Sequence, residues 1–500
     1  MKRWAILLVL GVFLHPAAVE AKTKAVKIRG YVTNVISPTE FEIEDYKIKS
    51  DKKLTLDLDK GETKEDVAFN PGDIRVGTEL EIQGDYDEET GELRARSIKV
   101  FLEEYKKVKR TALLAHTPLL ERSGEGWVGT FFADGQRIRI DPATQVLFKP
   151  NKSERQALKE KEKAEKKAAE EKKKRKKEEE ESPEEEEKYT RPLASVEEVG
   201  PNFFMTYEGF REPDGSIRAL RVEFMRNELE KGEANLWKSL NPEVKEPNKP
   251  GKPRELKVPR VGKFKLVQNE EAQVYVRQLG EKLIPAYQKE MPADDPDKVP
   301  FRFYLVEGKQ ANAFALPNGV VVIFSPMFEL LQNEAQLGTV VGHEIAHSIQ
   351  EHSRLQHEYH RKKLMAMRIG AFAAALLGAP VVGDVLNMMV GAIQSGYSRA
   401  LENQSDRLGL EYLLASGYDP REAPRVWKQM AKKYGVQPTN IFWSSHENAV
   451  TRRSYLMAEI RNNYAELDFG QFTTNEAEFQ RIAALVKEAT TKKKKPKKTT

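Results

Sequence analysis

The sequence predicts a multidomain protein in which two all-β, OB-like barrel repeats precede a mainly α-helical α+β domain. A chain of 500 residues is long enough for about two to four domains. Between residues 26 and 101, short apolar segments alternate with polar residues at period two, which is typical of half-buried strands. After residue 263 the apolar residues recur at helical spacing, as at Ala272, Val276, Leu279 and Leu283.

The β-rich half contains an internal repeat. Residues 76–98 resemble residues 199–222, and each stretch begins at a Val-Gly pair and passes through a glycine turn. A duplicated domain is the economical interpretation, with one OB-like β-domain at 25–105 and a second at 106–228. OB-like barrels commonly bind single-stranded nucleic acid, but these strands lack a basic face interleaved with aromatic residues. We therefore expect no nucleic-acid partner, and expect the repeats to bind partner proteins or to position the rest of the chain.

Three segments of biased composition fall outside the predicted cores. A run of Lys and Glu at 153–188 interrupts the second repeat, has no apolar stripe, and is expected to be a solvated insertion rather than a docking arm. Pairs four residues apart, such as Glu162 with Lys166, could support a helix there by about 0.3 kcal/mol each. The Pro-rich stretch at 229–262 is predicted to be a linker, and the basic tail at 489–500 to be disordered.

Charge and cysteine content exclude several classes of function. The chain carries 82 Lys and Arg against 77 Asp and Glu, a net charge of +5, so no uniformly basic surface is implied. It contains no cysteine, which excludes thiol nucleophiles, cysteine-bound zinc and disulfides. Any metal ion must therefore be held by His, Asp or Glu.

The N-terminus has the three parts of a secretory signal. Lys2 and Arg3 precede an apolar run from Trp4 to Leu14, and a stretch with small residues ends at Ala21. The apolar run is about half the length needed to span a bilayer. We expect 1–21 to be a signal peptide cleaved near Ala21, which exports the mature chain to the periplasm or beyond and makes envelope proteins the partners of the β-repeats.

A second apolar stretch at 364–393 resembles a membrane span in composition. Pro380 breaks it, and it carries Arg368 and Asp384, so each half is too short to cross a bilayer. We interpret it as an apolar helical hairpin over the core, and expect no transmembrane span in the mature chain. An exposed part of the hairpin could contact a membrane surface or an unfolded polypeptide.

An H-E-x-x-H motif occupies residues 343–347 inside an apolar helical segment. Four helical residues advance by about 400°, so His343 and His347 project from the same face and can share one zinc ion. Glu344 lies at the edge of that face, where it can take a proton from a zinc-bound water. Two ordinary helix histidines are the alternative, but the flanking Val and Ile residues indicate a buried helix, where His and Glu side chains without partners would be costly.

A catalytic zinc ion usually has three protein ligands and a position for water. Downstream, Glu402 and Asp406 form an E-x-x-x-D pair that shares one face of a predicted helix. Either can bind the metal while the other orients a ligand histidine. Acidic residues four apart are also common on solvated helices, so the pair alone decides nothing.

Four ordered motifs resemble one family of enzymes. Residues 312–319, the 343–347 motif, residues 402–406 and the Ser445-His446 pair together resemble the HtpX and CAAX prenyl protease type 1 family of zinc metalloendopeptidases, especially its soluble periplasmic branch. The resemblance covers about residues 267–460 and does not include the β-repeats. It implies a zincin (gluzincin) metallopeptidase domain at 263–488 that binds one Zn²⁺ per chain.

The resemblance also implies roles for individual residues. It implies that Glu402 is the third zinc ligand and that Asp406 is a second-layer residue that orients one of the ligands. His446 and Arg452 match a histidine and an arginine that stabilise the oxyanion, although Glu447 stands where the family usually has proline. The strand from Gly319 to residue 324, with Asn312 and Ala313 before it, is implied to be the edge strand that pairs with an extended substrate.

Helical geometry argues against two further histidines as the third zinc ligand. On a continuing helix, His352 would point about 140° away from His347, and His357 would lie roughly 15 Å along the axis from it. Neither is therefore expected to reach the metal, and replacing either is expected to leave it bound.

These observations predict a zinc-dependent endopeptidase of the cell envelope. Glu344 is the expected general base, and the expected substrates are unfolded or misassembled exported polypeptides, which is a role in protein quality control. The alternative is a chaperone-like or partner-binding assembly factor with a latent or structural zinc site. A structural site has no need of the base, so the presence of Glu344 favours the enzyme.

Overall fold

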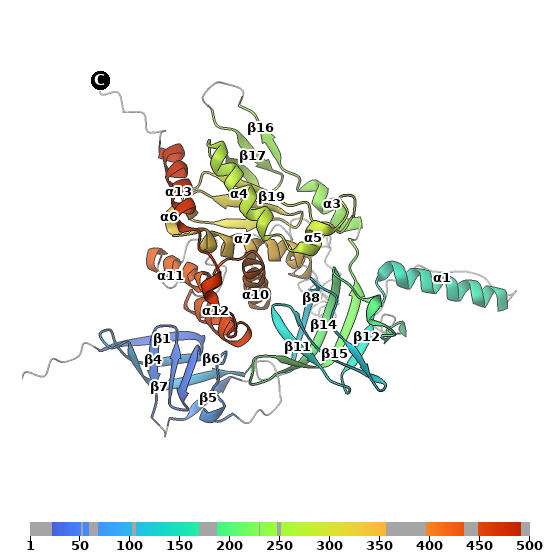
Figure 1. The fold of residues 1–500 in the computed structure, drawn as a ribbon, viewed down its shortest axis with the longest axis horizontal. Helices are drawn as coiled ribbons and strands as arrows, with labels where there is room; N and C mark the ends of the chain where they lie inside the picture. The colour runs from blue at the N-terminus through green and yellow to red at the C-terminus, as the bar shows by residue number, and fades with distance from the viewer. Residues whose placement is uncertain are drawn as a thin grey trace, which may run out of the picture.

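The computed structural model describes residues 23–51, 54–59, 69–102, 107–169, 188–229, 231–247, 252–356, 397–434 and 449–491. The predicted signal peptide, the predicted apolar hairpin and the basic tail from residue 492 lie outside these ranges. Figure 1 shows two β-rich units next to a mainly helical unit, with helix α1 reaching away from all three. The sequence thus divides as predicted into a β-rich part followed by a largely helical part.

The first β-domain is a seven-stranded sheet in the order β1-β6-β7-β4-β3-β2, with β5 paired to β7 beside β4. Alternate residues such as Leu80, Ile82, Ile98 and Val100 are fully or almost fully buried in its core, as the period-two pattern predicts. The elements are β1 (Thr23–Tyr31), β2 (Asn34–Ser37), β3 (Glu40–Ile43), β4 (Tyr46–Lys49), β5 (Leu56–Asp59), η1 (Pro71–Asp73), β6 (Glu79–Asp87) and β7 (Glu92–Phe101).

The second β-domain is an eight-stranded sheet in the order β13-β12-β15-β11-β10-β9, with β14 paired to β15 and β8. Its core contains Trp127, Ile138, Tyr207 and Phe224. The elements are β8 (Val108–Leu113), β9 (Glu121–Ser123), β10 (Gly126–Ala133), β11 (Gln136–Ile140), β12 (Gln145–Phe148), α1 (Lys152–Ala169), β13 (Arg191–Pro192), η3 (Val196–Glu198), β14 (Phe203–Arg211) and β15 (Ile217–Arg226).

The two sheets have the same topology. In each, the last hairpin is antiparallel, and its second strand pairs on the other edge with two shorter parallel strands. In each, the second strand of that hairpin carries the extra residue of a β-bulge, Arg96 or Leu220. A glycine of the first strand, Gly84 or Gly209, lies at the bulge, where an added Cβ would overlap a backbone oxygen of the partner strand. No pairing among the described strands closes either sheet, so the OB-like barrels stay a prediction.

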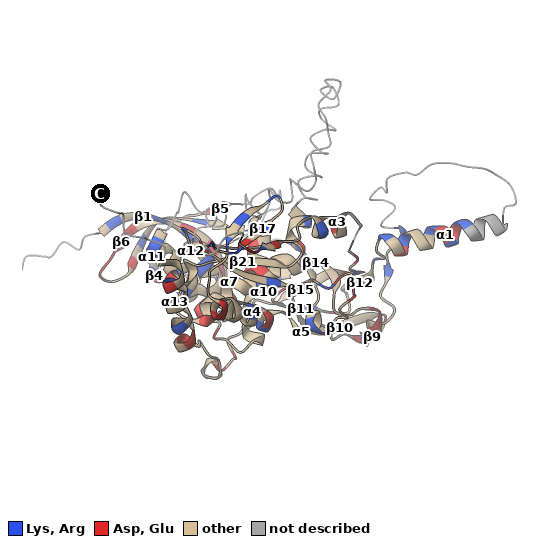
Figure 2. Ribbon diagram, turned by 90° about the horizontal axis from the view of Figure 1, so that it is seen from above, with Lys and Arg blue, Asp and Glu red and all other residues tan. Residues whose placement is uncertain are grey.

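The charged segment begins as a helix that projects from the second β-domain. Figure 2 shows α1 extending into solvent with Lys, Arg and Glu along its length. The prediction that nothing in 153–188 joins a core is wrong for Arg155, which is buried and donates to the Pro150 carbonyl at 2.7 Å. Most described residues beyond Arg155 are exposed, and residues 170–187 lie outside the described chain.

The prediction that the segment at 229–262 is a linker is wrong for much of its length, because apolar residues in it are buried. Leu236, Leu240, Leu256 and Val258 pack in one cluster with Val322 of the helical unit. The segment therefore includes elements of that unit: α3 (Lys231–Ser239), β16 (Glu243–Lys245), β17 (Glu255–Val258) and the start of β18 (Gly262–Lys265), with the strands in the order β16-β17-β18.

The helical unit contains a second small sheet, which lies beside the motif helix. Its strand order is β19-β21-β20, so the strand that begins after Gly319 is central, and the prediction that it forms the edge is wrong. The edge strands are β19 and β20, and β20 contains Ala313. The elements are α4 (Glu270–Leu283), α5 (Ala286–Glu290), β19 (Arg302–Val306), β20 (Ala313–Ala315), β21 (Val320–Phe324), α6 (Met327–Leu330), α7 (Glu334–Ile349), α10 (Arg399–Ala415), α11 (Glu422–Tyr434), α12 (Ala449–Asn463), η6 (Phe469–Gln471) and α13 (Glu476–Thr491).

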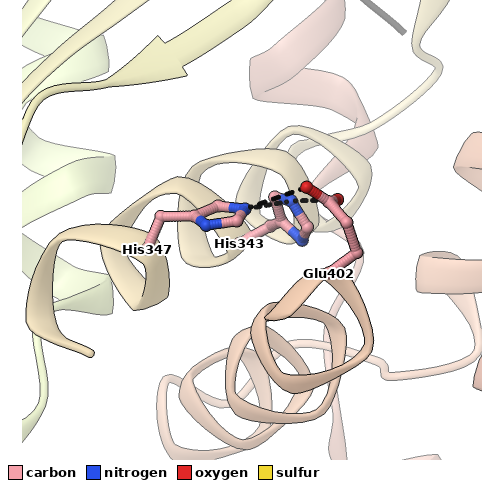
Figure 3. A group of neighbouring side chains, drawn as sticks. All are labelled: His343, His347 and Glu402. Carbon is pink, nitrogen blue, oxygen red and sulfur yellow. Dashed lines mark hydrogen bonds and ion pairs between the residues drawn. The ribbon is translucent and has the colours of Figure 1, made fainter. Parts of the chain in front are cut away.

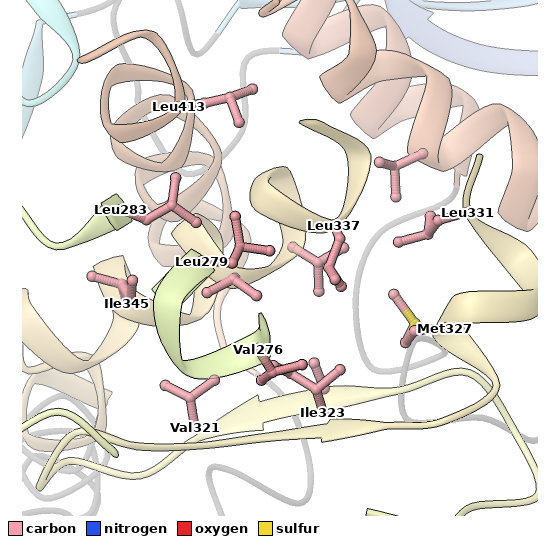
Figure 4. Packing of buried hydrophobic residues seen from close by; sticks show 14 of the residues in the cluster. Val276, Leu279, Leu283, Val321, Ile323, Met327, Leu331, Leu337, Ile345 and Leu413 are labelled. Carbon is pink, nitrogen blue, oxygen red and sulfur yellow. The ribbon is translucent and has the colours of Figure 1, made fainter. Parts of the chain in front are cut away.

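One apolar cluster packs α4, α7 and α10 with this sheet. Figure 4 shows Leu279 of α4 among side chains of β21, α7 and α10. Helices α7 and α10 approach closely because glycines face each other: an added Cβ on Gly409 would lie 2.9 Å from the His343 nitrogen, and one on Gly342 would lie 3.1 Å from the Gly409 oxygen. Among the described helices, none is both long and apolar enough to cross a bilayer.

Both β-domains contact the helical unit through specific side chains. In the first, the Tyr31 amide donates to Ser454 Oγ of α12 at 2.8 Å, and Glu79 pairs with Arg399 at the start of α10 at 2.8 and 3.0 Å. In the second, Leu113 belongs to the same apolar cluster as α7, and its amide donates to the Gln350 side chain at 2.8 Å. The helices that follow the motif therefore lie against β-domain residues.

Removing residues 160–187 should change the free energy of unfolding by less than about 1 kcal/mol. The contacts of the described residues that it removes lie near the surface, such as those of Glu162 with Lys188 at 2.9 Å and with the Tyr189 hydroxyl at 3.3 Å, and loop closure depends only weakly on length. Urea denaturation followed by circular dichroism measures the change. The control is Arg155→Ala, which removes a hydrogen-bond donor from the Pro150 carbonyl and should destabilise the protein by about 1–3 kcal/mol. A deletion as destabilising as this control would contradict the prediction.

Candidate metal centre

Helix α7 presents the two motif histidines to α10. The helix begins at Glu334, and the side chain of the preceding Asn333 accepts a hydrogen bond from the Gln336 amide and caps the first turn. Every residue of the helix is buried. His343 and His347 are one turn apart, and their ring centroids lie 4.6 Å apart. Figure 3 shows both imidazoles directed toward Glu402. The structure therefore brings these two predicted ligands together.

Glu402 of α10 completes a group of three buried ligand atoms. His343 Nε2 lies 3.0 Å from His347 Nε2 and 3.4 Å from Glu402 Oε2, and Glu402 Oε1 lies 3.6 Å from His347 Nε2. Ligands bound about 2.0–2.2 Å from a tetrahedral zinc ion lie roughly 3.3 Å from one another. The three side chains therefore have the spacing and the chemistry of a single zinc site.

Asp406 orients His343. Its Oδ1 lies 3.0 Å from His343 Nδ1, so that nitrogen donates to the carboxylate. The lone pair of the ring is then on Nε2, which faces His347 and Glu402. The E-x-x-x-D spacing on α10 thus places one carboxylate beside the ligand atoms and the other behind a ligand ring, as predicted.

Arg452 of α12 binds both carboxylates. Its guanidinium donates to Asp406, with one bond of 2.9 Å, and to Glu402 at 3.2 Å, and it stacks on the Trp427 ring at 3.8 Å. The structure therefore places Arg452 on the ligand residues, which is a contact that sequence reasoning did not predict. Its role on an oxyanion stays a prediction, and His446 lies outside the described residues.

The charges of this buried group call for a cation. Glu402 and Asp406 supply two carboxylates, and Arg452 balances one of them. The two imidazole nitrogens that face each other at 3.0 Å present lone pairs if each ring is protonated on its other nitrogen. A buried excess of negative charge and lone pairs is costly unless a positive ion binds there, and Zn²⁺ suits two imidazoles and a carboxylate.

Glu344 lies on the side of the motif helix that faces β20. Burial raises the pKa of its carboxyl to about 7, and a hydrogen bond from the Ala315 backbone opposes that rise. A carboxylate with a pKa near neutrality can both accept and return a proton. The structure thus gives Glu344 the environment of a general base, next to the edge strand.

His347 is held from behind by His352. The two Nδ1 atoms lie 2.8 Å apart, and His352 Nε2 lies 2.8 Å from Gln404 Oε1. The assumption of a continuing helix is wrong, because α7 ends at Ile349 and Glu351 has a φ of 52°, which turns His352 back toward the motif. Burial lowers the pKa of His352 to about 4, so this ring is neutral at pH 7.

Sequence reasoning missed three residues around His347. Besides His352 and Gln404, the Tyr397 ring stacks on the His347 ring with centroids 4.2 Å apart. Gln404 stands between the two acidic residues that the sequence singled out, but nothing in the sequence relates it to His352. Among the described residues, only His343, His347 and Glu402 form a group with metal-ligand spacing, and His357 lies outside those residues.

Comparison with known proteins agrees with this geometry. Residues 270–460 match Peptidase family M48, and residues 29–99 match a domain of unknown function, DUF5666. Residues 270–460 are therefore similar to M48 metallopeptidases, and we call this region the metallopeptidase domain. The match includes α7, α10 and α12, so all the ligand candidates and Arg452 belong to the metallopeptidase domain. The second β-domain lies outside both matches.

Several curated proteases are similar to the metallopeptidase domain. The beta-barrel assembly-enhancing protease of Yersinia pestis is 32% identical over 152 residues, which is 29% of this chain and 31% of that protein. That of Escherichia coli K12 is 30% identical over 154 residues, 29% and 31% of the two chains. The mitochondrial metalloendopeptidase OMA1 of Arabidopsis thaliana is 32% identical over 149 residues, 30% and 29%. The alignments span about a third of each relative.

Replacing Glu402 with glutamine should weaken zinc binding by at least about 100-fold, because an amide offers the ion no negative charge. Competition with a fluorescent chelator measures the affinity. The matched control is Glu411→Gln, which lies on the same helix roughly 13 Å further along its axis and should keep the affinity. Equal affinities for the two variants would exclude Glu402 as a ligand.

Proposed function

We propose that the chain is a zinc-dependent endopeptidase that binds one Zn²⁺ through His343, His347 and Glu402. The observation that carries the proposal is the placement of Glu344 beside these three residues on the side that faces an edge strand. A bound zinc ion supplies a Lewis acid for the scissile carbonyl and lowers the pKa of a bound water. The protein supplies the base, the orientation of the ligands and a surface for the substrate.

Glu344 is the group that moves the proton in this proposal. Its carboxylate accepts a proton from the attacking water and returns it to the amine that leaves. The raised pKa supports both steps near neutral pH, because the protonated and ionised forms are then close in free energy. Arg452 holds Glu402 and Asp406 in place through its hydrogen bonds to both.

The outer edge of β20 is the proposed binding surface for an extended substrate. Leu316 and Asn312 bond to β21, through Leu316 N to Val320 O and Phe324 N to Asn312 O, at 2.9 Å each. Backbone groups alternate along an antiparallel strand, so those of Ala313 and Ala315 point to the opposite edge. There Ala313 N donates to Asn312 Oδ1 at 2.9 Å and the Ala315 backbone bonds to Glu344, and a substrate strand that pairs with β20 replaces these contacts. A substrate strand paired there passes beside Glu344. This β-augmentation accepts many sequences, because backbone hydrogen bonds supply the contact.

We further propose an exported enzyme that acts on unfolded or misassembled proteins of the cell envelope. The signal-like N-terminus and the similarity to beta-barrel assembly-enhancing proteases support this location and substrate class. The motifs at 312–319 and 445–446 support the HtpX and CAAX prenyl protease type 1 group in its soluble periplasmic branch. The shared topology of the two sheets supports OB-like domains that bind envelope partners.

Replacing Glu344 with glutamine should lower casein hydrolysis by at least about 100-fold while zinc stays bound, because an amide does not accept the proton of the water at neutral pH. Fluorescent casein measures the activity, and a chelator should abolish the activity of the unmodified protein. Glu329→Gln, an exposed position on α6, is the control and should retain full activity. An active Glu344 variant would contradict the proposed base.

A further inference from the structure

A turn of the second β-domain reaches the helix that carries Glu402. Asp134 and Gly135 form a two-residue hairpin turn between β10 and β11, with φ values of 54° and 65° and the flanking pair Ala133 and Gln136 in register. An Asp-Gly sequence favours this turn, because both positions need positive φ. The turn contacts α10 directly: an added Cβ on Gly135 would lie 2.6 Å from Arg407 Cβ.

The Asp134 carboxylate is buried in this contact, and its two oxygens have different partners. Oδ2 accepts from Arg407 Nη2 at 2.8 Å and from the Tyr207 hydroxyl at 2.7 Å. Oδ1 accepts from Gln404 Nε2 at 2.6 Å. The bond from Tyr207 lies within the β-domain and the bond from Arg407 joins the domain to α10, whereas the bond from Gln404, also on α10, leads toward the metal centre.

The orientation of the Gln404 amide follows from these partners. Its nitrogen lies 2.6 Å from an Asp134 oxygen and 3.0 Å from the Thr111 carbonyl, and both of these groups only accept hydrogen bonds. The NH₂ group must therefore face the β-domain, and Gln404 Oε1 must face His352. That oxygen only accepts, so His352 Nε2 carries the proton that it shares with Gln404 at 2.8 Å.

The hydrogen bonds of His352 also fix the tautomer of the ligand His347. A neutral His352 protonated on Nε2 has its lone pair on Nδ1, where the Ser405 hydroxyl at 3.2 Å and His347 Nδ1 at 2.8 Å can donate to it. His347 is then protonated on Nδ1, which leaves the lone pair of Nε2 directed at His343 and Glu402. A ring protonated on Nε2 instead could not bind the metal through that atom.

We propose that Asp134 of the second β-domain is a positioning residue of the metal centre, which acts through Gln404 and His352 to keep His347 in the tautomer that binds metal. The inference rests on the proposed function, since it needs the three-residue zinc site. A residue of the preceding β-domain thereby orients a ligand histidine of the metallopeptidase domain without binding the metal itself. Zinc affinity depends on the docking of the β10–β11 turn.

The decisive variant is Asp134→Asn. Asparagine suits the Asn-Gly turn as well as aspartate does, so the hairpin is kept. Its single oxygen is needed by Arg407, which only donates, and its NH₂ then faces the NH₂ of Gln404. We expect zinc to bind about 10–100-fold more weakly, the usual effect of losing a partner behind a ligand histidine. Chelator competition on the full chain measures the affinity.

Tyr207→Phe is the matched control. It removes one hydrogen bond from the other oxygen of the same carboxylate and leaves Gln404 bonded to Oδ1. We expect a lower melting temperature and an unchanged zinc affinity. If Tyr207→Phe weakens zinc binding as much as Asp134→Asn does, loss of domain docking accounts for the effect and the proposal is wrong.

Gln404→Met decides the question if Asp134→Asn does not fold. It leaves the bonds between Asp134 and Arg407 in place and removes the acceptor of His352, so zinc affinity should again fall about 10–100-fold. In metal-free protein with ¹⁵N-labelled histidine, the signal of His347 Nε2 should shift toward the protonated form in both variants. Unchanged affinity and unchanged histidine signals in a folded Gln404→Met variant overturn the proposal.

Failure of the proposed function is recognised separately. If the unmodified protein binds zinc but cleaves no casein, the endopeptidase proposal is wrong, while the dependence of zinc affinity on Asp134 still stands. If the unmodified protein cleaves casein with zinc and the Asp134→Asn and Gln404→Met variants retain its zinc affinity, only the positioning role is wrong.

Discussion

The contact between α7 and α10 is the constraint on which the metal centre depends. The two helices supply all three ligand candidates, and they approach closely because Gly342 and Gly409 have no side chains to separate them. A Cβ at Gly409 would meet the backbone of His343 itself, so even alanine would shift a ligand. The spacing of about 3–4 Å between ligand atoms that a zinc ion requires is therefore set by backbone packing.

The buried ligand residues need hydrogen-bond partners of their own. Each ligand residue has partners that fix its charge or its tautomer: Asp406 behind His343, Arg452 on Glu402, and His352 behind His347. Removing one member of a buried ion pair typically costs about 3–5 kcal/mol, because the other member is left uncompensated. An incomplete network is therefore costly, and the hydrogen bonds behind His347 continue through Gln404 to Asp134 of the second β-domain.

The two β-domains share one topology, and each contacts the helical unit through a strand and through a hairpin turn. The first uses Tyr31 of β1 and the turn between β3 and β4, where Asp45 pairs with Arg453 of α12. The second uses Leu113 of β8 and the turn that contains Asp134. The same two kinds of contact therefore occur in both domains, although the side chains that make them differ. In this protein, the second β-domain contacts the helix that carries Glu402 through the turn that contains Asp134.

The sequence by itself determined the division into a β-rich and a helical half, the repeat, the motif helix and the two acidic residues of α10, because each depends on periodicity or spacing within one element. It did not predict the central place of β21, the packed segment at 229–262, the return of His352 after α7 ends, or the contact of Arg452 with Glu402. Only the tertiary structure decided these features. Each joins residues that lie on different elements or beyond a helix end, where helical and strand periodicity carry no information about which side chains meet.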